Sequence, residues 1–322
     1  MRMAFAPWSR SSCGAVLAVI LCACLPDQQF AALGDLQLES GEVLRDCRIG
    51  YRTFGRLDET GSNAVLVTPW AMGTSADLAR QIASGRLVDV SGRYVVAVDA
   101  LGNGVSSSPS NSQRQPGSAF PRFSFRDVVD SQYQLLTRVL GVHHLRAVVG
   151  ASAGGMQAFQ WATAYPEFVD QAIAIAGSPR SSAEDRRRWL EFVDELGRQP
   201  PWRRALHALS RGAPWDALRQ LLADSGDFER QALAIAALDV SAPFAGSMER
   251  AAAAVRAEML VVVPERDEVV DTRPALEFAR LARARVVTID GRCGHRATSC
   301  ESEAIRAAVT RFLGDDPRSA SR

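Results

Sequence analysis

Three residues spread along the chain have the types that nucleophilic catalysis requires. Ser152 lies in the pentapeptide Gly150-Ala-Ser-Ala-Gly154, Asp267 lies in the second half of the chain, and His295 lies near its carboxyl end. A serine hydroxyl is a poor nucleophile unless a base accepts its proton, and the base needs a partner that fixes its tautomer. A serine, a histidine and a carboxylate could supply these three roles.

The sequence around Ser152 predicts a strand, a sharp turn and a helix. The apolar run 147–149 precedes the serine, and Met156, Phe159 and several alanines follow it without a helix breaker until Pro166. Such a turn holds the serine exposed, and its neighbours must be small because the two backbones approach closely. The pentapeptide alone should occur by chance in roughly one chain in ten of this length. The strand and helix on either side therefore carry the functional interpretation.

Of the four histidines, one is expected at the same sheet edge as the serine. His143 and His144 precede the strand of the serine, so they belong at its opposite end, and His207 falls in a helical segment. His295 follows the last predicted strand, at the carboxyl edge where parallel sheets form their sites. We therefore predict that His295 is the base.

The acid is expected in the loop after the predicted strand 259–263. Asp267 is our candidate, with Glu265, Glu268 and Asp290 as alternatives. The resulting order of serine, aspartate and histidine along the chain is that of the α/β-hydrolase fold.

The oxyanion of an acyl-transfer intermediate needs two backbone N–H donors. By convention they come from the residue after the nucleophile and from the loop after the third strand. These positions are Ala153 and Ala71.

Apolar strands alternate with helices along most of the chain. Such strands are typical of a mostly parallel sheet covered by helices on both faces, which is the architecture we predict. The first two strands should form an antiparallel hairpin at the front. Strands are expected at 36–39, 43–54, 63–69, 94–99, 147–149, 171–176, 259–263 and 285–289.

Between residues 179 and 258 the pattern contains helical stripes and no strand. We predict that 179–258 is a helical cap inserted into an α/β core made of 35–178 and 259–314. The arginine run 186–188 within it is typical of a solvated helix face. Residues 315–322 are expected to be a disordered tail.

Residues 1–24 carry arginines and then a short apolar run, the pattern of a secretory signal. The ending Leu21-Cys-Ala-Cys24 resembles a lipobox, in which Cys24 would be lipidated and could anchor the protein to a membrane. Ordinary cleavage nearby is the alternative. Either outcome predicts a periplasmic or secreted protein.

The cysteines are consistent with an oxidising compartment. Cys293 and Cys300 flank the candidate histidine and could form a loop disulfide worth roughly 2 to 3 kcal/mol, with two free thiols as the alternative. Cys47 is expected to be a buried bystander in a strand. The spacing of His and Cys fits no zinc pattern, so we expect no metal.

The composition excludes several functions. The chain has 322 residues and a formal net charge of +1, which argues against a nucleic-acid partner. It contains no lysine, which excludes a Schiff-base or pyridoxal-phosphate enzyme and a Walker-A phosphate loop. We expect no cofactor.

Several segments of the sequence carry a family resemblance. They are Tyr51–Arg56, Ser62–Val67, Val148–Gln157 with Trp161, Tyr165-Pro166, and Gly294-His295. Together they resemble homoserine O-acetyltransferases and related α/β-hydrolases. This resemblance implies acyl transfer through an acyl-serine, with Ser152, Asp267 and His295 as the triad. The acetyltransferases commonly carry Asp directly after the catalytic His, whereas Arg296 stands here and would repel the ammonium group of homoserine.

Acetyl-CoA is not expected outside the cytoplasm, so water is the expected acyl acceptor of an exported enzyme. The expected substrate is a small ester or related acyl compound. One alternative is a CoA-dependent O-acyltransferase of the homoserine O-acetyltransferase type, retained in the cytoplasm. Another is a non-catalytic binding module that keeps the fold.

Overall fold

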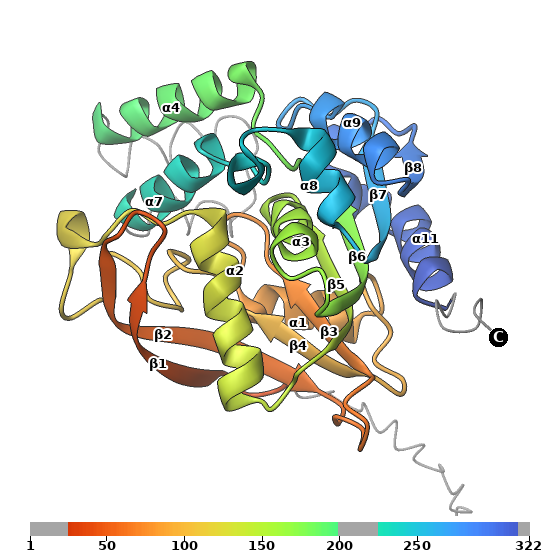
Figure 1. Cartoon of the computed structure of the whole chain (residues 1–322), viewed down its shortest axis with the longest axis horizontal. Coiled ribbons are helices and arrows are strands. Elements are labelled where there is room, and N and C mark those ends of the chain that lie inside the picture. Colours follow the sequence, from red (N-terminus) through yellow and green to blue (C-terminus); the bar gives the residue numbers. More distant parts are fainter. Residues whose placement is uncertain (1–24, 199–224, 315–322) are drawn as a thin grey trace, which may run out of the picture.

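The computed structural model describes residues 25–198 and 225–314 (Figure 1). Eight strands form one sheet in the order β1-β2-β4-β3-β5-β6-β7-β8. The pairs β1–β2 and β2–β4 are antiparallel, and all other neighbours are parallel, as predicted. The strands are β1 (Gln29–Gln37), β2 (Val43–Phe54), β3 (Ala64–Thr68), β4 (Tyr94–Val98), β5 (Leu145–Ala151), β6 (Val169–Ile175), β7 (Glu258–Pro264) and β8 (Arg285–Ile289).

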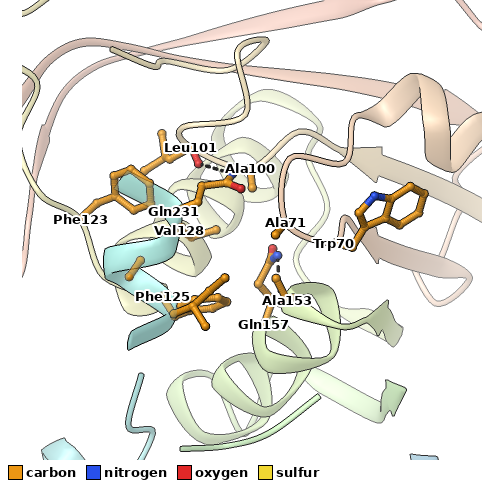
Figure 2. Close-up of a pocket in the computed structure, with 12 residues that line it drawn as sticks. Trp70, Ala71, Ala100, Leu101, Phe123, Phe125, Val128, Ala153, Gln157 and Gln231 are labelled. Carbon is orange, nitrogen blue, oxygen red and sulfur yellow. Dashed lines mark hydrogen bonds between the residues drawn. The ribbon is translucent and has the colours of Figure 1, made fainter. Parts of the chain in front are cut away.

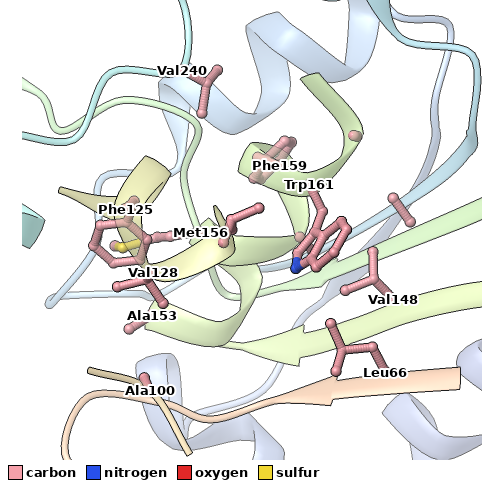
Figure 3. Packing of buried hydrophobic residues seen from close by; sticks show 14 of the residues in the cluster. Leu66, Ala100, Phe125, Val128, Val148, Ala153, Met156, Phe159, Trp161 and Val240 are labelled. Carbon is pink, nitrogen blue, oxygen red and sulfur yellow. The ribbon is translucent and has the colours of Figure 1, made fainter. Parts of the chain in front are cut away.

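Helices cover both faces of the sheet because successive strand residues point to opposite sides. Val65 and Val67 of β3 join one apolar cluster, whereas Leu66 joins the other. Figure 3 shows Phe159 and Trp161 packed among the residues of this second cluster. It is formed with α2 (Phe125–Gln134), α3 (Ala153–Ala164), α8 (Met248–Ala254) and α9 (Arg273–Leu281), and the first cluster with α1 (Ser75–Ala83) and α11 (Ser302–Gly314).

Two elements differ from the sequence expectation. β1 begins at Gln29 rather than at Leu36, and its pairing with β2 is irregular around Gly34. The helix α1 was not predicted, although a capping box at its start joins Thr74 and Asp77. The helix α2 continues directly into a π-helix, Leu135–Val139.

The described part of the segment between β6 and β7 contains helices joined by turns, and no strand. α4 (Ala183–Arg198) and α7 (Ser225–Ala236) lie side by side, away from the sheet (Figure 1). An isolated β-bridge between Arg180 and Asp239 joins the residues before α4 to those after α7. By contrast, α8 packs against α3 and α9 in the layer that covers the sheet. The division into core and cap at residues 179 and 258 stays a prediction.

Polar anchors hold α7 in place. Asp227 accepts hydrogen bonds from the backbone N–H of Ser110, at 2.9 Å, and from its hydroxyl, at 2.5 Å. Arg230 donates to the carbonyl oxygens of Phe120 and Ser118 at 3.1 and 3.2 Å. Both anchors join α7 to the long loop that follows β4.

Several expectations fall on residues outside the described ranges. These are the signal segment 1–24 with Cys24, residues 199–224 of the predicted cap, and the tail 315–322. Within residues 25–198 and 225–314, no helix combines the length and the apolar character that crossing a bilayer requires. The short helices there are Gly117–Ala119, Ala242–Phe244, Gly294–Arg296 and Ala297–Cys300.

Candidate active site

Ser152 occupies a strained turn between β5 and α3. Its backbone has φ 56° and ψ −122°, a conformation that non-glycine residues rarely adopt. A Cβ on Gly150 would lie 2.2 Å from the carbonyl oxygen of Gly154, and one on Gly154 would lie 2.4 Å from that of Thr68. The two glycines are therefore required because the backbones pass too close for any side chain, as the sequence predicted.

The structure brings Ser152, His295 and Asp267 into one hydrogen-bonded chain. The Ser152 Oγ lies 2.8 Å from His295 Nε2, and His295 Nδ1 lies 2.8 Å from Asp267 Oδ2. The exposed fraction of the side chain is 18% for His295 and 0% for Asp267. The carboxylate is therefore shielded from water while the ring reaches the surface, as a base with an orienting partner requires.

The loop after β7 presents the Asp267 carboxylate to the histidine. Asp267 Oδ1 accepts hydrogen bonds from the backbone N–H groups of Val269 and Val270, both at 2.9 Å, which leaves Oδ2 for the imidazole. The alternatives Glu265, Glu268 and Asp290 are exposed. Of the four candidate acids, Asp267 is the one that contacts the histidine.

The loop after β7 that carries Asp267, residues 265–272, is called the acid loop below, and it also contacts α4. The Asp271 N–H donates to Asp185 Oδ2 at 2.9 Å, and Arg188 donates to Asp185 and to the Glu268 carbonyl oxygen. Arg187 pairs with Glu191 on the exposed face of the helix. In the arginine run, Arg188 thus supports the acid loop and Arg187 has the surface role that the sequence predicted.

The base is held by a tight turn. Gly294 has φ +50°, and a Cβ there would lie 2.3 Å from the carbonyl oxygen of Arg266 in the acid loop. A disulfide bond joins Cys293, just before this glycine, to Cys300. His144, by contrast, lies before β5 and contacts Asp170, with its Nε2 2.8 Å from the carboxylate, at the opposite end of the sheet.

The two expected oxyanion donors lie beside the serine. Ala153 is the first residue of α3, and the first N–H groups of a helix have no intrahelical acceptor. Ala71 lies in a turn after β3, which is closed by a 2.9 Å hydrogen bond from the Gly73 N–H to the Trp70 carbonyl oxygen. In a trans peptide the N–H points opposite to the carbonyl, so the Ala71 N–H points away from the turn.

A chain of buried side-chain amides connects this turn to the core. Trp161 Nε1 donates to Gln132 at 2.8 Å, Gln132 donates to Gln157 at 2.6 Å, and Gln157 donates to the Pro69 carbonyl oxygen at 3.1 Å. A buried amide without a hydrogen-bond partner lowers the stability of the fold by about 1 to 3 kcal/mol, so the fold favours the state in which all these hydrogen bonds are formed. The sequence did not predict these hydrogen bonds, because a polar residue within an apolar helix gives no periodic signal that names its partner.

A narrow cavity opens next to both expected donors. Figure 2 shows Ala71 lying over Ala153 and Gln157, with Phe125 nearby. The cavity encloses about 290 Å³, part of it open to solvent, and its lining is mostly apolar. It is lined by Trp70, Ala71, Ala100, Leu101, Phe123, Phe125, Val128, Ala153, Gln157, Gln231, Ala234 and Ile235.

Cys47 is the one free cysteine among the residues that the structure describes. Cys47 is buried in β2, and this burial raises the pKa of its thiol to about 12. In the described ranges, no three His, Cys, Asp or Glu side chains come together as a metal site would need.

Comparison with known proteins supports this architecture. A family model described as alpha/beta hydrolase fold matches residues 65–219. The acetylester hydrolase of Corynebacterium glutamicum superposes with a TM-score of 0.80 at 24% identity, over 89% of this chain and 95% of the other. The chain has the α/β-hydrolase fold. Homoserine O-acetyltransferase from Bacillus anthracis, another α/β-hydrolase, superposes with a TM-score of 0.78 at 20% identity, over 91% and 99% of the two chains.

The sequence relatives of this chain include proteins named as hydrolases and as transferases. It is 36% identical over 180 residues to the ethyl acetate hydrolase of Pseudomonas veronii, which is 55% of this chain and 52% of the other. It is 36% identical over 172 residues to homoserine O-acetyltransferase of Chloroherpeton thalassium, which is 51% and 44% of the two. The chain therefore matches about half the length of these curated relatives.

Proposed function

We propose that this α/β-hydrolase is a serine esterase that works through an acyl-serine intermediate. The observation that carries the proposal is the hydrogen-bonded chain Ser152–His295–Asp267, which ends at a strained turn beside an apolar cavity. Burial of the carboxylate keeps the histidine oriented, and the turn presents the hydroxyl to a bound acyl group.

The geometry supports a two-step reaction. Ser152 Oγ attacks the acyl carbon while His295 Nε2 takes its proton, and the resulting oxyanion accepts hydrogen bonds from the N–H groups of Ala71 and Ala153. The alcohol then leaves with the proton from His295. Water enters, gives a proton to the same nitrogen, and attacks the acyl-serine, which releases the acid and restores the serine hydroxyl.

The cavity favours a small acyl group. Its volume of about 290 Å³ and its apolar lining, which includes the rings of Phe123 and Phe125, suit a short hydrocarbon chain. The relative named ethyl acetate hydrolase acts, by its name, on an ester of this size. We therefore propose esters of short carboxylic acids as the substrate class.

The second candidate is a CoA-dependent O-acyltransferase, because homoserine O-acetyltransferase of Chloroherpeton thalassium is 36% identical over about half of the chain. Both reactions share the acyl-serine and differ in the acceptor. Arg296 is exposed directly after the base, where the acetyltransferases carry an acid that suits an ammonium group. This substitution favours water over homoserine. The third possibility, a non-catalytic binding module, would leave the strained turn at Ser152 without a use.

We also propose that the protein is exported. The apolar run in residues 1–24 and the disulfide between Cys293 and Cys300 support this proposal. Lipidation of Cys24 would then tether the enzyme to a membrane, whereas simple cleavage would release it. The mass of the amino-terminal peptide of the mature protein distinguishes these outcomes, and a full-length amino terminus would contradict both.

Hydrolysis of p-nitrophenyl acetate by the mature protein, beside Ser152→Ala, tests the catalytic proposal. We expect turnover by the wild type, an acetyl adduct on Ser152 by intact mass, and loss of both in the variant. Equal rates in the two proteins without an adduct would contradict the serine mechanism. Added homoserine with acetyl-CoA tests the transferase, which would yield O-acetylhomoserine.

A further inference from the structure

The turn at residues 70–73 after β3, which carries the Ala71 N–H and is called the oxyanion turn below, is held from both sides by glutamine side chains. Gln157 of α3 donates to the Pro69 carbonyl oxygen, ahead of the turn. Gln231 of α7 accepts a hydrogen bond from the Met72 N–H at 2.7 Å, within the turn. The peptide that carries the Ala71 N–H lies between these two contacts.

Gln231 uses both ends of its amide. Its Oε1 accepts the hydrogen bond from the Met72 N–H. Its Nε2 donates to the Leu101 carbonyl oxygen at 2.9 Å, as Figure 2 shows. Only 7% of the residue is exposed, and it lines the same cavity as Ala71 and Ala153. One side chain of α7 thus connects the loop after β3 with the loop after β4.

The turn needs such support because its backbone is strained. Met72 has φ +59° and is 5% exposed, so a bulky residue is held in the left-handed region inside the protein. Such a conformation costs on the order of 1 to 3 kcal/mol and persists only when its surroundings hold it. Without the bond to Gln231 the 71–72 peptide could rotate to relieve the strain, and a shift of the Ala71 Cα during this rotation would also move the 70–71 peptide, whose N–H belongs to Ala71.

We infer that Gln231 is a positioning residue for the oxyanion hole. By holding the Met72 N–H, it keeps the Ala71 N–H directed at the place where negative charge develops, and it makes a helix outside the sheet part of the catalytic geometry. This inference rests on the proposed serine mechanism. If Gln231 served only to attach α7 to the two loops, its loss would affect folding or substrate binding. A positioning residue instead affects the stability of the transition state selectively.

Gln231→Met tests the inference because it keeps the length of the side chain and removes both hydrogen bonds. Removing an oxyanion donor lowers kcat by about 100-fold to 1,000-fold, and a misdirected donor should cost less. We expect kcat for p-nitrophenyl acetate to fall about 10-fold to 100-fold while KM changes by less than about threefold. The affinity for a small alkylboronic acid, which forms a tetrahedral adduct with serine, should fall by a similar factor.

Arg230→Met is the matched control. It places the same new side chain on the same helix and removes hydrogen bonds to Phe120 and Ser118, which lie outside the turn. We expect a lower melting temperature with kcat close to that of the wild type. Equal losses of kcat in both variants, or a Gln231→Met enzyme within about twofold of the wild type, would overturn the inference.

Two further comparisons keep the outcome decisive. If Gln231→Met does not fold, Gln231→Asn keeps the buried amide but is one methylene too short to reach both loops, and kcat should still fall at least about fivefold. A wild type that hydrolyses no ester, or hydrolyses it equally after Ser152→Ala, would refute the proposed function. If esterase activity depends on Ser152 but kcat is unchanged by substitution of Gln231, the positioning role alone is refuted.

Discussion

Substitution of Gly294 by alanine should separate catalysis from folding. The new Cβ would lie 2.3 Å from the Arg266 carbonyl oxygen, and ordinary contact begins at 3.4 Å, so the two loops must part by about 1.1 Å. His295 is the next residue and moves with its loop. A displacement of about 1 Å can cost about 100-fold in rate, which corresponds to about 2.7 kcal/mol. We expect kcat/KM for p-nitrophenyl acetate to fall about 100-fold.

The control for this prediction is Gly141→Ala. Gly141 also has a positive φ, +65°, but no atom lies within 4 Å of the position that its Cβ would take. Both variants carry the left-handed strain of about 1 to 2 kcal/mol, which should lower the melting temperature by a few degrees. Gly294→Ala alone should lose activity. Similar kcat/KM values in the two variants would refute the idea that the approach of Gly294 to the acid loop positions the base.

Three other outcomes follow from the structure. Phe125 and Ala234 line both the cavity beside the oxyanion donors and a second cavity, so Phe125→Ala should merge the two cavities. The rate on p-nitrophenyl hexanoate relative to that on p-nitrophenyl acetate should then rise by about tenfold. An unchanged ratio of these two rates would show that the ring does not separate the cavities. Cys300→Ser should lower the free energy of unfolding by roughly 2 to 3 kcal/mol, and reductant should then lower the melting temperature of the wild type but not of the variant. Because burial raises the pKa of Cys47 to about 12, its thiol stays protonated at pH 8 and should react with iodoacetamide only after unfolding; labelling of the folded protein would contradict this.

Local sequence was sufficient for the turn at Ser152 and for most strands. The small residues around the serine are required by distances within one strand–turn–helix unit, so their spacing is visible in the sequence. β5 and β6 are buried on both faces and appear as continuous apolar runs. β1 was harder to predict because only Ala31 and Leu36 of its nine residues are buried, so its apolar pattern is weak.

The contacts that hold the catalytic loops could not be predicted in the same way. Asp267 was one of four acids within reach of the same sheet edge, and its choice depends on backbone N–H groups two and three residues later. Gln231 lies in a helix whose sequence shows only that it is amphipathic. Its partners, Met72 and Leu101, are more than one hundred residues away in the chain. Such pairings become visible only when the fold brings the loops together.

The segment between β6 and β7 therefore has more than one role in the proposed mechanism. α4 holds the acid loop through the contact of Asp185 with Asp271, and α7 holds the oxyanion turn through Gln231. The base itself is held by the turn at Gly294, which approaches the acid loop. A movement of α4 or α7 would thus change the position of a catalytic loop as well as the shape of the cavity. Substitutions of Asp185 and Gln231, the residues of these helices that contact the loops, should therefore alter the rate, whereas substitutions in α8, which packs on α3 and α9, should alter mainly stability.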